Sequence, residues 1–462
     1  MPRHKKVLPE INLKKSEDKA EKKTPRLLGM KDIVGSEQIC YDYVVNKALN
    51  LAKLYSFSSI KTPILESFSL YKKSTRRNND KEFYFVEAEK NEKNILRPEL
   101  TQGIVRAYIE NNLGESGLPA RLYSLGSVFR HEKLQSGRYR ESTQFDLEII
   151  GEKKAMAEAI LITIAHNFFE ELNIGTQLQI NSIGSAECRK EYCNKLTAFF
   201  KERGRRSKLC NSCKNNLGKT CLSLLDCKED ACVKLREEAP QIADYLSDES
   251  REHFTRTLEF LDELNITYNF NPYLVRGLNY YNDTIFEFWP TNEDGTSQGK
   301  LALGGGGRYD SLVEGLGGAS VPAVGLALGI ERTVSRLKDK HLLTNPEEDD
   351  IVFIAQLGDQ AKLKALQLFQ ELRRAGFNVR QSFASDSLKV QLEEAVLMKA
   401  KTALILGKKE IMDGTILMRE MDSSAQETVV YKKIKERLAK KDKLVEKKLN
   451  NNRKEGGLYG GF

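Results

Sequence analysis

Long apolar runs are absent from this sequence of 462 residues. No stretch approaches the length of about 18 apolar residues that a membrane-spanning helix needs. The N-terminal segment also lacks an apolar stretch behind its basic residues, so it does not resemble a secretory signal. We therefore expect a cytoplasmic protein with no membrane partner, whose 8 cysteines are reduced thiols or metal ligands rather than a disulfide framework.

Excess positive charge is confined to the two ends of the chain. Residues 1–26 contain nine Lys and Arg against four Asp and Glu, and residues 431–462 contain eleven against four. Because the formal net charge is +8, the region between them is slightly acidic. Polar basic ends of this kind are either solvated disordered tails or additional phosphate contacts for a nucleic acid held by the folded body.

The hydrophobic pattern between the tails indicates an α+β organisation. An amphipathic helix at 33–54 precedes short strand signals separated by polar turns, which favours an antiparallel sheet flanked by helices. After a polar linker, strands and helices alternate as in a small α/β domain. The predicted parts are a basic tail at 1–24, a catalytic domain at 25–338 with a helical insertion at 186–268, a linker at 339–350, an α/β domain at 351–431 and a basic tail at 432–462.

Neither glycine-rich segment fits a nucleotide-binding loop. Gly304–Gly307 lacks the G-x-G-x-x-G order, and Gly218-Lys219-Thr220 lacks the first glycine of a phosphate loop. We expect strands at 273–276, 284–288 and 301–303, the last directly before the glycine run. A phosphate site in this chain would therefore have to be built from arginines.

The segment from Phe129 to Arg140 supplies such arginines. Two short strands joined by a basic loop would form a hairpin, and the arginine fork can bind two phosphate oxygens at once. By itself, the pattern is also that of an ordinary charged hairpin.

Three stretches in order resemble the motifs of class II aminoacyl-tRNA synthetases. Pro63 after a long helix resembles motif 1, Phe129-Arg130-x-Glu132 with the returning strand to Glu148 resembles motif 2, and Pro322 to Arg332 resembles motif 3. Residues 96–101, 274–281 and 306–310 further resemble the histidyl-tRNA synthetase family. The resemblance extends from about Gly29 to about Val430.

The resemblance implies a fold, a reaction and an assembly. The fold would be a class II antiparallel-sheet catalytic domain with a helical insertion, followed by a C-terminal α/β anticodon-binding domain. The enzyme would be a ligase that activates histidine with ATP, its substrate, and transfers it to the 3′ end of tRNA(His). Mg²⁺ would bridge the phosphates, and motif 1 would form a homodimer.

The resemblance also implies roles for individual residues. An ionised histidine carboxylate needs no base, so the first step needs positive charge at the α-phosphate. The catalytic candidates are Arg130, Arg276 and Arg332. The histidine-binding candidates, which would supply acceptors for the amino group and partners for the ring, are Glu99, Leu100, Thr101, Arg130, Gln144, Glu148, Arg276, Tyr280 and Tyr281. The ATP-binding candidates are Arg130, Glu132, Ser142 and Arg332, and the tRNA-binding candidates are Gln135 and Arg138.

The sequence departs from the family at several positions. Ser142 stands where most class II enzymes have the phenylalanine that stacks on adenine, and Lys133-Leu134 replaces the usual Arg-Pro of the motif 2 loop. What replaces the missing ring does not follow from the sequence.

The insertion contains seven cysteines, and some have the spacing of zinc ligands. Cys210-x2-Cys213 and Cys227-x4-Cys232, with Cys221 between them, match that spacing. Enzymes of the resembled family do not generally need zinc, and buried free cysteine is common in protein cores. We therefore favour packing thiols, with a structural zinc as the alternative.

Two other functions compete with this interpretation. One is a non-catalytic, synthetase-like regulatory subunit of the first enzyme of histidine biosynthesis, which characteristically lacks the α/β domain predicted here at 351–431. The other is a class II synthetase for a different amino acid, against which the segment Arg276-Gly277-Leu278-Asn279-Tyr280-Tyr281 argues.

Overall fold

The structure is a computed structural model. It describes residues 24–72, 82–87, 92–117, 119–131, 137–218, 221–292, 301–339, 351–382 and 386–440. Apart from residue 339, which ends a helix, the predicted linker lies outside these residues, as do most of both basic tails. Among the helices described, none is both long enough and apolar enough to cross a membrane. The chain divides into two compact units, Met1–Leu343 and Thr344–Phe462.

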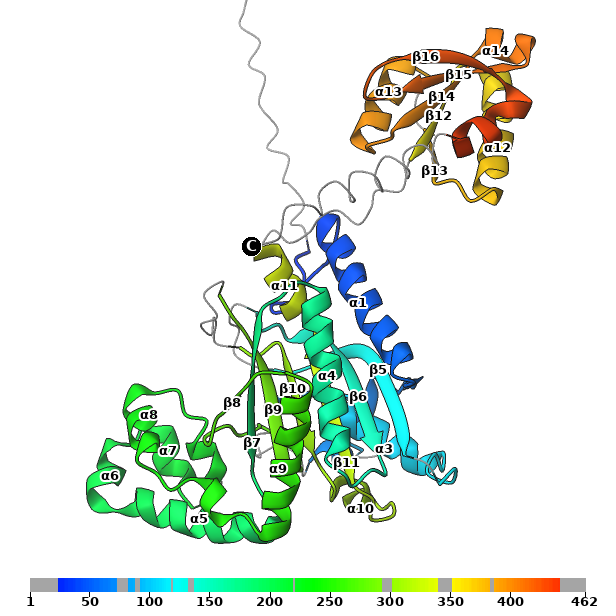
Figure 1. The fold of residues 1–462 in the computed structure, drawn as a ribbon. Helices are drawn as coiled ribbons and strands as arrows, with labels where there is room; N and C mark the ends of the chain where they lie inside the picture. Colours follow the sequence, from blue (N-terminus) through cyan, green and yellow to red (C-terminus); the bar gives the residue numbers. More distant parts are fainter. Residues whose placement is uncertain are drawn as a thin grey trace, which may run out of the picture. The chain divides into compact units, whose positions relative to one another are not determined.

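An eight-stranded sheet forms the centre of the first unit (Figure 1). Its strands pair antiparallel except at the two edges, where β1 with β5 and β7 with β8 are parallel. The strands in spatial order are β1 (Ser58–Ser59), β5 (Ala120–Phe129), β6 (Glu141–Ile150), β11 (Ala323–Gly329), β10 (Gly304–Arg308), β9 (Asn282–Pro290), β7 (Thr176–Ser182) and β8 (Tyr268–Phe270). The predicted fold class, an antiparallel-rich sheet with helices, is confirmed.

Long helices cover one face of this sheet. They are α1 (Ser36–Leu54), α4 (Met156–Glu171), α9 (Asp248–Glu263) and α11 (Ile330–Asp339). In α1 the buried residues Cys40, Val44, Ala48 and Leu51 recur every three or four positions, so one stripe of the helix enters the core. This core includes Phe145, Leu147 and Ile149 of β6.

A small sheet and several short helices complete this part of the unit. A three-stranded sheet has the order β2 (Leu65–Ser67), β4 (Asn94–Leu96), β3 (Tyr84–Val86). The accompanying helices are α2 (Phe68–Tyr71), α3 (Thr101–Glu110) and α10 (Leu312–Gly315). Buried residues of α3 belong to a second core that it shares with the insertion.

The insertion between β7 and β8 is helical, as predicted. Its elements are α5 (Ala186–Lys201), α6 (Arg203–Lys208), α7 (Asn211–Asn216), η2 (Cys221–Leu224), α8 (Asp230–Glu237), η3 (Ile242–Tyr245) and α9. The Ser185 and Ser247 hydroxyls cap α5 and α9 by accepting from the Cys188 and Ser250 N–H groups. Cys193 and Cys221 form a disulfide, so the expectation of uniformly reduced thiols or metal ligands is wrong for this pair.

The second unit is a five-stranded mixed sheet with helices, described here by itself. The order is β13 (Val379–Gln381), β12 (Val352–Gln356), β14 (Thr402–Leu406), β15 (Thr415–Glu420), β16 (Gln426–Val430), with the first three parallel. The helices are α12 (Asp359–Arg374), α13 (Leu388–Leu397), α14 (Lys408–Asp413), η4 (Tyr431–Lys433) and a helix at 434–440. Because Ile434 and Leu438 are buried, folded structure continues past residue 431, where the sequence analysis begins the tail.

Two expected strands are not strands. Residues 273–276 lie in a loop, where the Asn271 side chain accepts a hydrogen bond from the Tyr273 N–H and stabilises a turn. Residues 301–303 are also irregular, whereas the glycine run beside them forms β10. Glycine is disfavoured in strands, so the sequence pattern gave no indication of this element.

Candidate active site

Strand β6 presents polar side chains on one face and apolar side chains on the other. Successive strand residues point to opposite sides, so Phe145, Leu147 and Ile149 enter the core beneath the helices. Gln144, Asp146 and Glu148 therefore share the other face. Asp146 and Glu148 are 1% and 0% exposed, which is unusual for carboxyl groups and marks this face as a binding site.

Glycines in β10 and β11 leave the space that charged side chains occupy. A Cβ atom at Gly325 would lie 1.8 Å from Glu148 Oε2, and one at Gly305 would lie 2.6 Å from an Arg276 guanidinium nitrogen. The glycine run at 304–307 is therefore a strand without side chains that lies beneath the site and pairs with β9 and β11. The glycine run is therefore not a phosphate loop, in agreement with the sequence, which lacks the order of glycines that such a loop needs.

Three buried carboxyl groups lie together, and the pKa of each is raised. Burial, reinforced by Asp146, holds the pKa of Glu148 well above its usual range. Burial and the neighbouring Glu99 do the same for the pKa of Asp146, while Arg130 and Arg276 oppose them. Burial also raises the pKa of Glu99, against the Gln102 N–H and Arg130. Such a cluster favours a bound cation, because a positive charge would offset the cost of ionising buried acids.

The sequence analysis missed Asp146. Both of its carboxylate oxygens are buried and have no hydrogen-bond partner among the described residues. Asp146 lies two positions from both Gln144 and Glu148, and residues two apart on a strand share a face. This spacing could have indicated that Asp146 belongs to the site.

Tyrosines form one side of the same site. The rings of Tyr280 and Tyr281 have centroids 4.8 Å apart, and the Tyr280 and Tyr309 centroids are 5.7 Å apart. The Tyr309 hydroxyl donates to Glu148 Oε2, so this tyrosine, which the sequence analysis did not include among the site residues, positions a predicted one. Aromatic rings with a hydroxyl at one end suit a flat, partly polar ligand.

Each of the three predicted arginines has a defined partner. Arg276 forms an ion pair with Glu287 at 2.8 Å and donates to Gly305 O at 3.2 Å. Although burial opposes its charge, Tyr281 and Glu287 raise the pKa of Arg276. Arg130 donates from Nε to Pro98 O at 2.7 Å, and Arg332 donates to Ala302 O at 2.9 Å. Because Arg130 and Arg276 both affect the pKa of Asp146, they converge on the carboxyl cluster.

The start of α3 holds two further predicted residues. Glu99 precedes α3, and its Oε1 accepts from the Gln102 N–H at 3.1 Å. Thr101 is the first helical residue, and its hydroxyl lowers the pKa of Glu148. The Leu100 side chain is completely buried in the second core, which also contains Tyr280, Tyr281 and Tyr309. The structure therefore brings Glu99 and Thr101 to the site, and Leu100 packs in the core that carries the site tyrosines.

Glu331 joins motif 3 to motif 2. Its two carboxylate oxygens accept from the Thr143 N–H at 2.9 and 2.8 Å, and the Tyr41 hydroxyl donates to Thr143 Oγ1 at 2.8 Å. The neighbouring Ser142 is half-buried and pairs with Val128 across the β5–β6 hairpin. The predicted hairpin is therefore present, and it is fixed against α1 and α11.

The loop of this hairpin is only partly described. Glu132 and Gln135 lie outside the described residues, so their predicted roles have no structural account. Arg138, in the returning part of the loop, is half-buried.

Arg308 supports the site without belonging to it. It is 2% exposed, and its guanidinium donates to both oxygens of Glu158 at 2.6 Å. His253 Nε2 lies 2.7 Å from the same carboxylate. Burial opposes ionisation, but His253 and Arg308 together lower the pKa of Glu158. This buried group connects β10, α4 and α9.

These features define a class II aminoacyl-tRNA synthetase fold with an appended α/β unit. The family model for histidyl-tRNA synthetase matches residues 29–333, and the model for an anticodon binding domain matches residues 351–441. The chain belongs to the histidyl-tRNA synthetase family, as its motifs predicted.

Individual relatives cover most of the chain. Histidine–tRNA ligase of Dehalococcoides mccartyi strain 195 is 39% identical over 405 residues, which span 87% of this chain and 96% of the relative. Histidine–tRNA ligase of Thermosipho melanesiensis is 36% identical over 405 residues, which span 87% of this chain and 95% of the relative. The crystal structure of apo S. aureus histidyl-tRNA synthetase has a TM-score of 0.75 and 29% identity, covering 89% of this chain and 99% of that one.

Proposed function

We propose that this protein is a histidine–tRNA ligase, which forms histidyl-adenylate from histidine and ATP and then transfers histidine to the 3′ end of tRNA(His). The observation that carries the proposal is the buried carboxyl cluster facing Arg130 and Arg276. It offers acceptors for an amino-group cation beside donors for a carboxylate and a phosphate. We also propose the cytoplasm as its location, because this reaction supplies translation.

The proposed histidine-binding residues fall into two groups, one for the α-amino group and one for the imidazole ring. Glu99, Thr101 and Gln144 would bind the α-amino group, and Glu148 and Tyr281 would bind the imidazole ring, with Tyr280 as a wall. Glu148 would thus accept a hydrogen bond from a ring N–H while Tyr309 holds its carboxylate in place. A ligand without ring donors would leave a buried carboxyl group unpaired, which is costly.

The arginines would supply the electrostatic part of the reaction. Arg130 and Arg276 would hold the histidine carboxylate against the α-phosphate, and Arg332 would hold ATP at its adenine and γ-phosphate. No base is required, because the carboxylate is already ionised near neutral pH. Mg²⁺ would arrive with ATP and take oxygen ligands. Glu287, which accepts from both Arg276 and Trp289, has oxygens of the type that this ion prefers.

Histidine-dependent exchange of pyrophosphate into ATP tests the proposal. Wild-type protein should catalyse exchange with histidine and not with other amino acids. Arg276→Ala should fold normally and lose about 10²-fold or more in exchange, because it removes charge stabilisation rather than packing. Arg256→Ala is the control, since this arginine is exposed and contacts Glu259 and the Phe260 ring on its own helix α9.

A folded wild-type chain without histidine-dependent exchange would overturn the proposal. It would favour the regulatory-subunit alternative, whereas exchange with another amino acid would favour a different synthetase. Near-normal exchange by Arg276→Ala would remove that arginine from the mechanism.

We further propose a homodimer formed through α1 and the segment around Pro63. Ile39, Leu54, Ile64 and Leu65 of this region are 50%, 77%, 48% and 45% exposed, which leaves apolar surface to be covered. Equilibrium sedimentation should give twice the chain mass, and Ile64→Asp with Leu65→Asp should shift the equilibrium to monomer. A fully active monomer at assay concentration would contradict this.

A further inference from the structure

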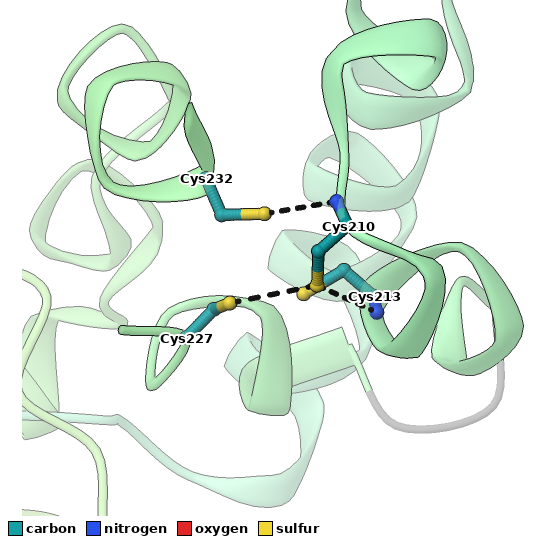
Figure 2. Close-up of side chains that lie close together, drawn as sticks. All are labelled: Cys210, Cys213, Cys227 and Cys232. Carbon is teal, nitrogen blue, oxygen red and sulfur yellow. Dashed lines mark hydrogen bonds between the residues drawn. The ribbon is translucent and has the colours of Figure 1, made fainter. Parts of the chain in front are cut away.

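Four cysteines of the insertion bring their sulfur atoms to one place (Figure 2). Cys210 is the N-cap residue of α7, Cys213 lies in its first turn, Cys227 lies in the loop before α8, and Cys232 lies in α8. All four sulfur atoms lie within 4.8 Å of one another. Residues from three separate stretches of chain thus converge on one point.

The separations fit a tetrahedral metal. A Zn–S bond of about 2.3 Å places the corners of a sulfur tetrahedron about 3.8 Å apart. The Cys210 and Cys227 sulfur atoms are 3.8 Å apart. An iron–sulfur cluster suits this spacing less well, because its thiolates bind different iron atoms and so lie further apart.

Backbone groups also point at the sulfur atoms. The Cys213 N–H donates to Cys210 Sγ at 3.4 Å, and the Cys210 N–H donates to Cys232 Sγ at 3.3 Å. Such N–H···S bonds stabilise thiolates and orient metal ligands. The last turn of α6, just before Cys210 in the sequence, also carries the cations Arg206 and Lys208.

Apolar packing alone does not account for this arrangement. Cys210 and Cys227 are only half-buried, and α6, α7 and α8 are helices of 6, 6 and 8 residues. Helices this short have little stability of their own and need a cross-link or a large core. Cys221 is joined to Cys193 instead, and Cys188 accepts from the Ser247 N–H away from the group, so Cys210, Cys213, Cys227 and Cys232 form one separate set.

We propose that Cys210, Cys213, Cys227 and Cys232 bind one zinc ion that stabilises the helical insertion. The structure thus favours the alternative over the packing thiols preferred from sequence alone. Binding exchanges the four thiol protons, which pass to solvent, for four Zn–S bonds, and no oxidant or reductant is needed. With no open ligand position, the ion would have a structural role.

The first experiment is elemental analysis of the full-length chain, purified with reductant and without chelator. We expect about one zinc per chain. Cys213→Ser and Cys232→Ser should reduce this to below about 0.2, whereas Cys40→Ser should retain it. Cys40 is a matched control, because it is a buried thiol on α1 whose sulfur donates only to Ser36 O, a bond that a serine can keep.

A second measurement does not depend on how the variants fold. Wild-type protein reconstituted with Co²⁺ should show the sulfur-to-cobalt absorption of a tetrahedral thiolate site. The thiols of Cys210, Cys213, Cys227 and Cys232 should react slowly with a thiol reagent until a chelator is added. A wild-type chain that stays metal-free after dialysis against zinc, or that contains disulfides among these four cysteines, would overturn the proposal. Neither readout uses aminoacylation, so the result is independent of the proposed function.

Discussion

Replacement of Gly325 by alanine tests whether the absence of a side chain on β11 makes room for the Glu148 carboxylate, which we propose binds histidine. The added Cβ would lie 1.8 Å from Glu148 Oε2 and 3.0 Å from Tyr309 Cε1, where ordinary contact begins near 3.4 Å. The carboxylate would therefore have to move by about 1.6 Å, and its bond from the Tyr309 hydroxyl would be lost or bent. Misplacement of about 1 Å in a catalytic site commonly costs about 10²-fold.

We expect kcat/KM for histidine in pyrophosphate exchange to fall by about 10²-fold or more, with the KM for ATP changing much less. Overpacking should cost about 1–3 kcal/mol, so the melting temperature should fall by only a few degrees. Gly315→Ala is the control, because the new methyl group would meet nothing within 4 Å at the end of α10. A Gly325→Ala protein with a normal KM for histidine would refute the argument that this glycine makes room for Glu148.

Three further predictions concern stability, ATP and pH. Arg308→Met should lower the free energy of unfolding of the first unit by about 3–5 kcal/mol in urea, because it leaves Glu158 buried without its main cation; a loss below about 1 kcal/mol would contradict this. Ser142→Phe should lower the KM for ATP if adenine lies over this position, since stacking adds about 0.5–1.5 kcal/mol, and an unchanged KM would place adenine elsewhere. Asp146→Asn should raise the melting temperature relative to wild type, and the difference should grow as pH rises above about 4. Because the pKa of Asp146 is raised in the folded protein, the unfolded wild-type chain ionises at a pH where the folded chain does not, and the wild-type fold loses stability. Melting temperatures of the two proteins that change in parallel with pH would exclude this.

Local patterns predicted the regular elements well. The helix expected at 33–54 is α1 at 36–54, and the strands and helices expected to alternate after the linker are β12 to β15 with α12 and α13. In both segments the apolar spacing agrees with the tertiary environment, so local and global preferences point the same way. Strand β16, by contrast, is at the edge of its sheet. Its burial alternates along the strand, but its sequence, Gln-Glu-Thr-Val-Val, does not alternate apolar and polar residues, so the sequence did not predict it.

The site was predicted only in part, because its members meet through sheet pairing. Glu148 and Arg276 are far apart in sequence, and motif resemblance alone brought them into one prediction. Glu287 contacts Arg276 and Tyr309 contacts Glu148 from distant parts of the sequence. Tyr309 lies in the stretch 306–310 that resembles the family, but nothing in the local sequence of Glu287 indicated a role. The cysteines show the same limit, since their spacing left Cys221 open as a fifth member until the fold separated it.

The attachment of the insertion also has a mechanical consequence. Phe254 and Leu261 of α9 belong to the main core, and His253 of the same helix meets Glu158 and, through it, Arg308. The insertion is thus joined to the main core along α9, in addition to the second core that it shares with α3. A displacement of α9 would act through His253 on Glu158 and so on Arg308, which ends the strand whose glycines lie beneath the site. Such a displacement would therefore be transmitted to the strand beneath Arg276.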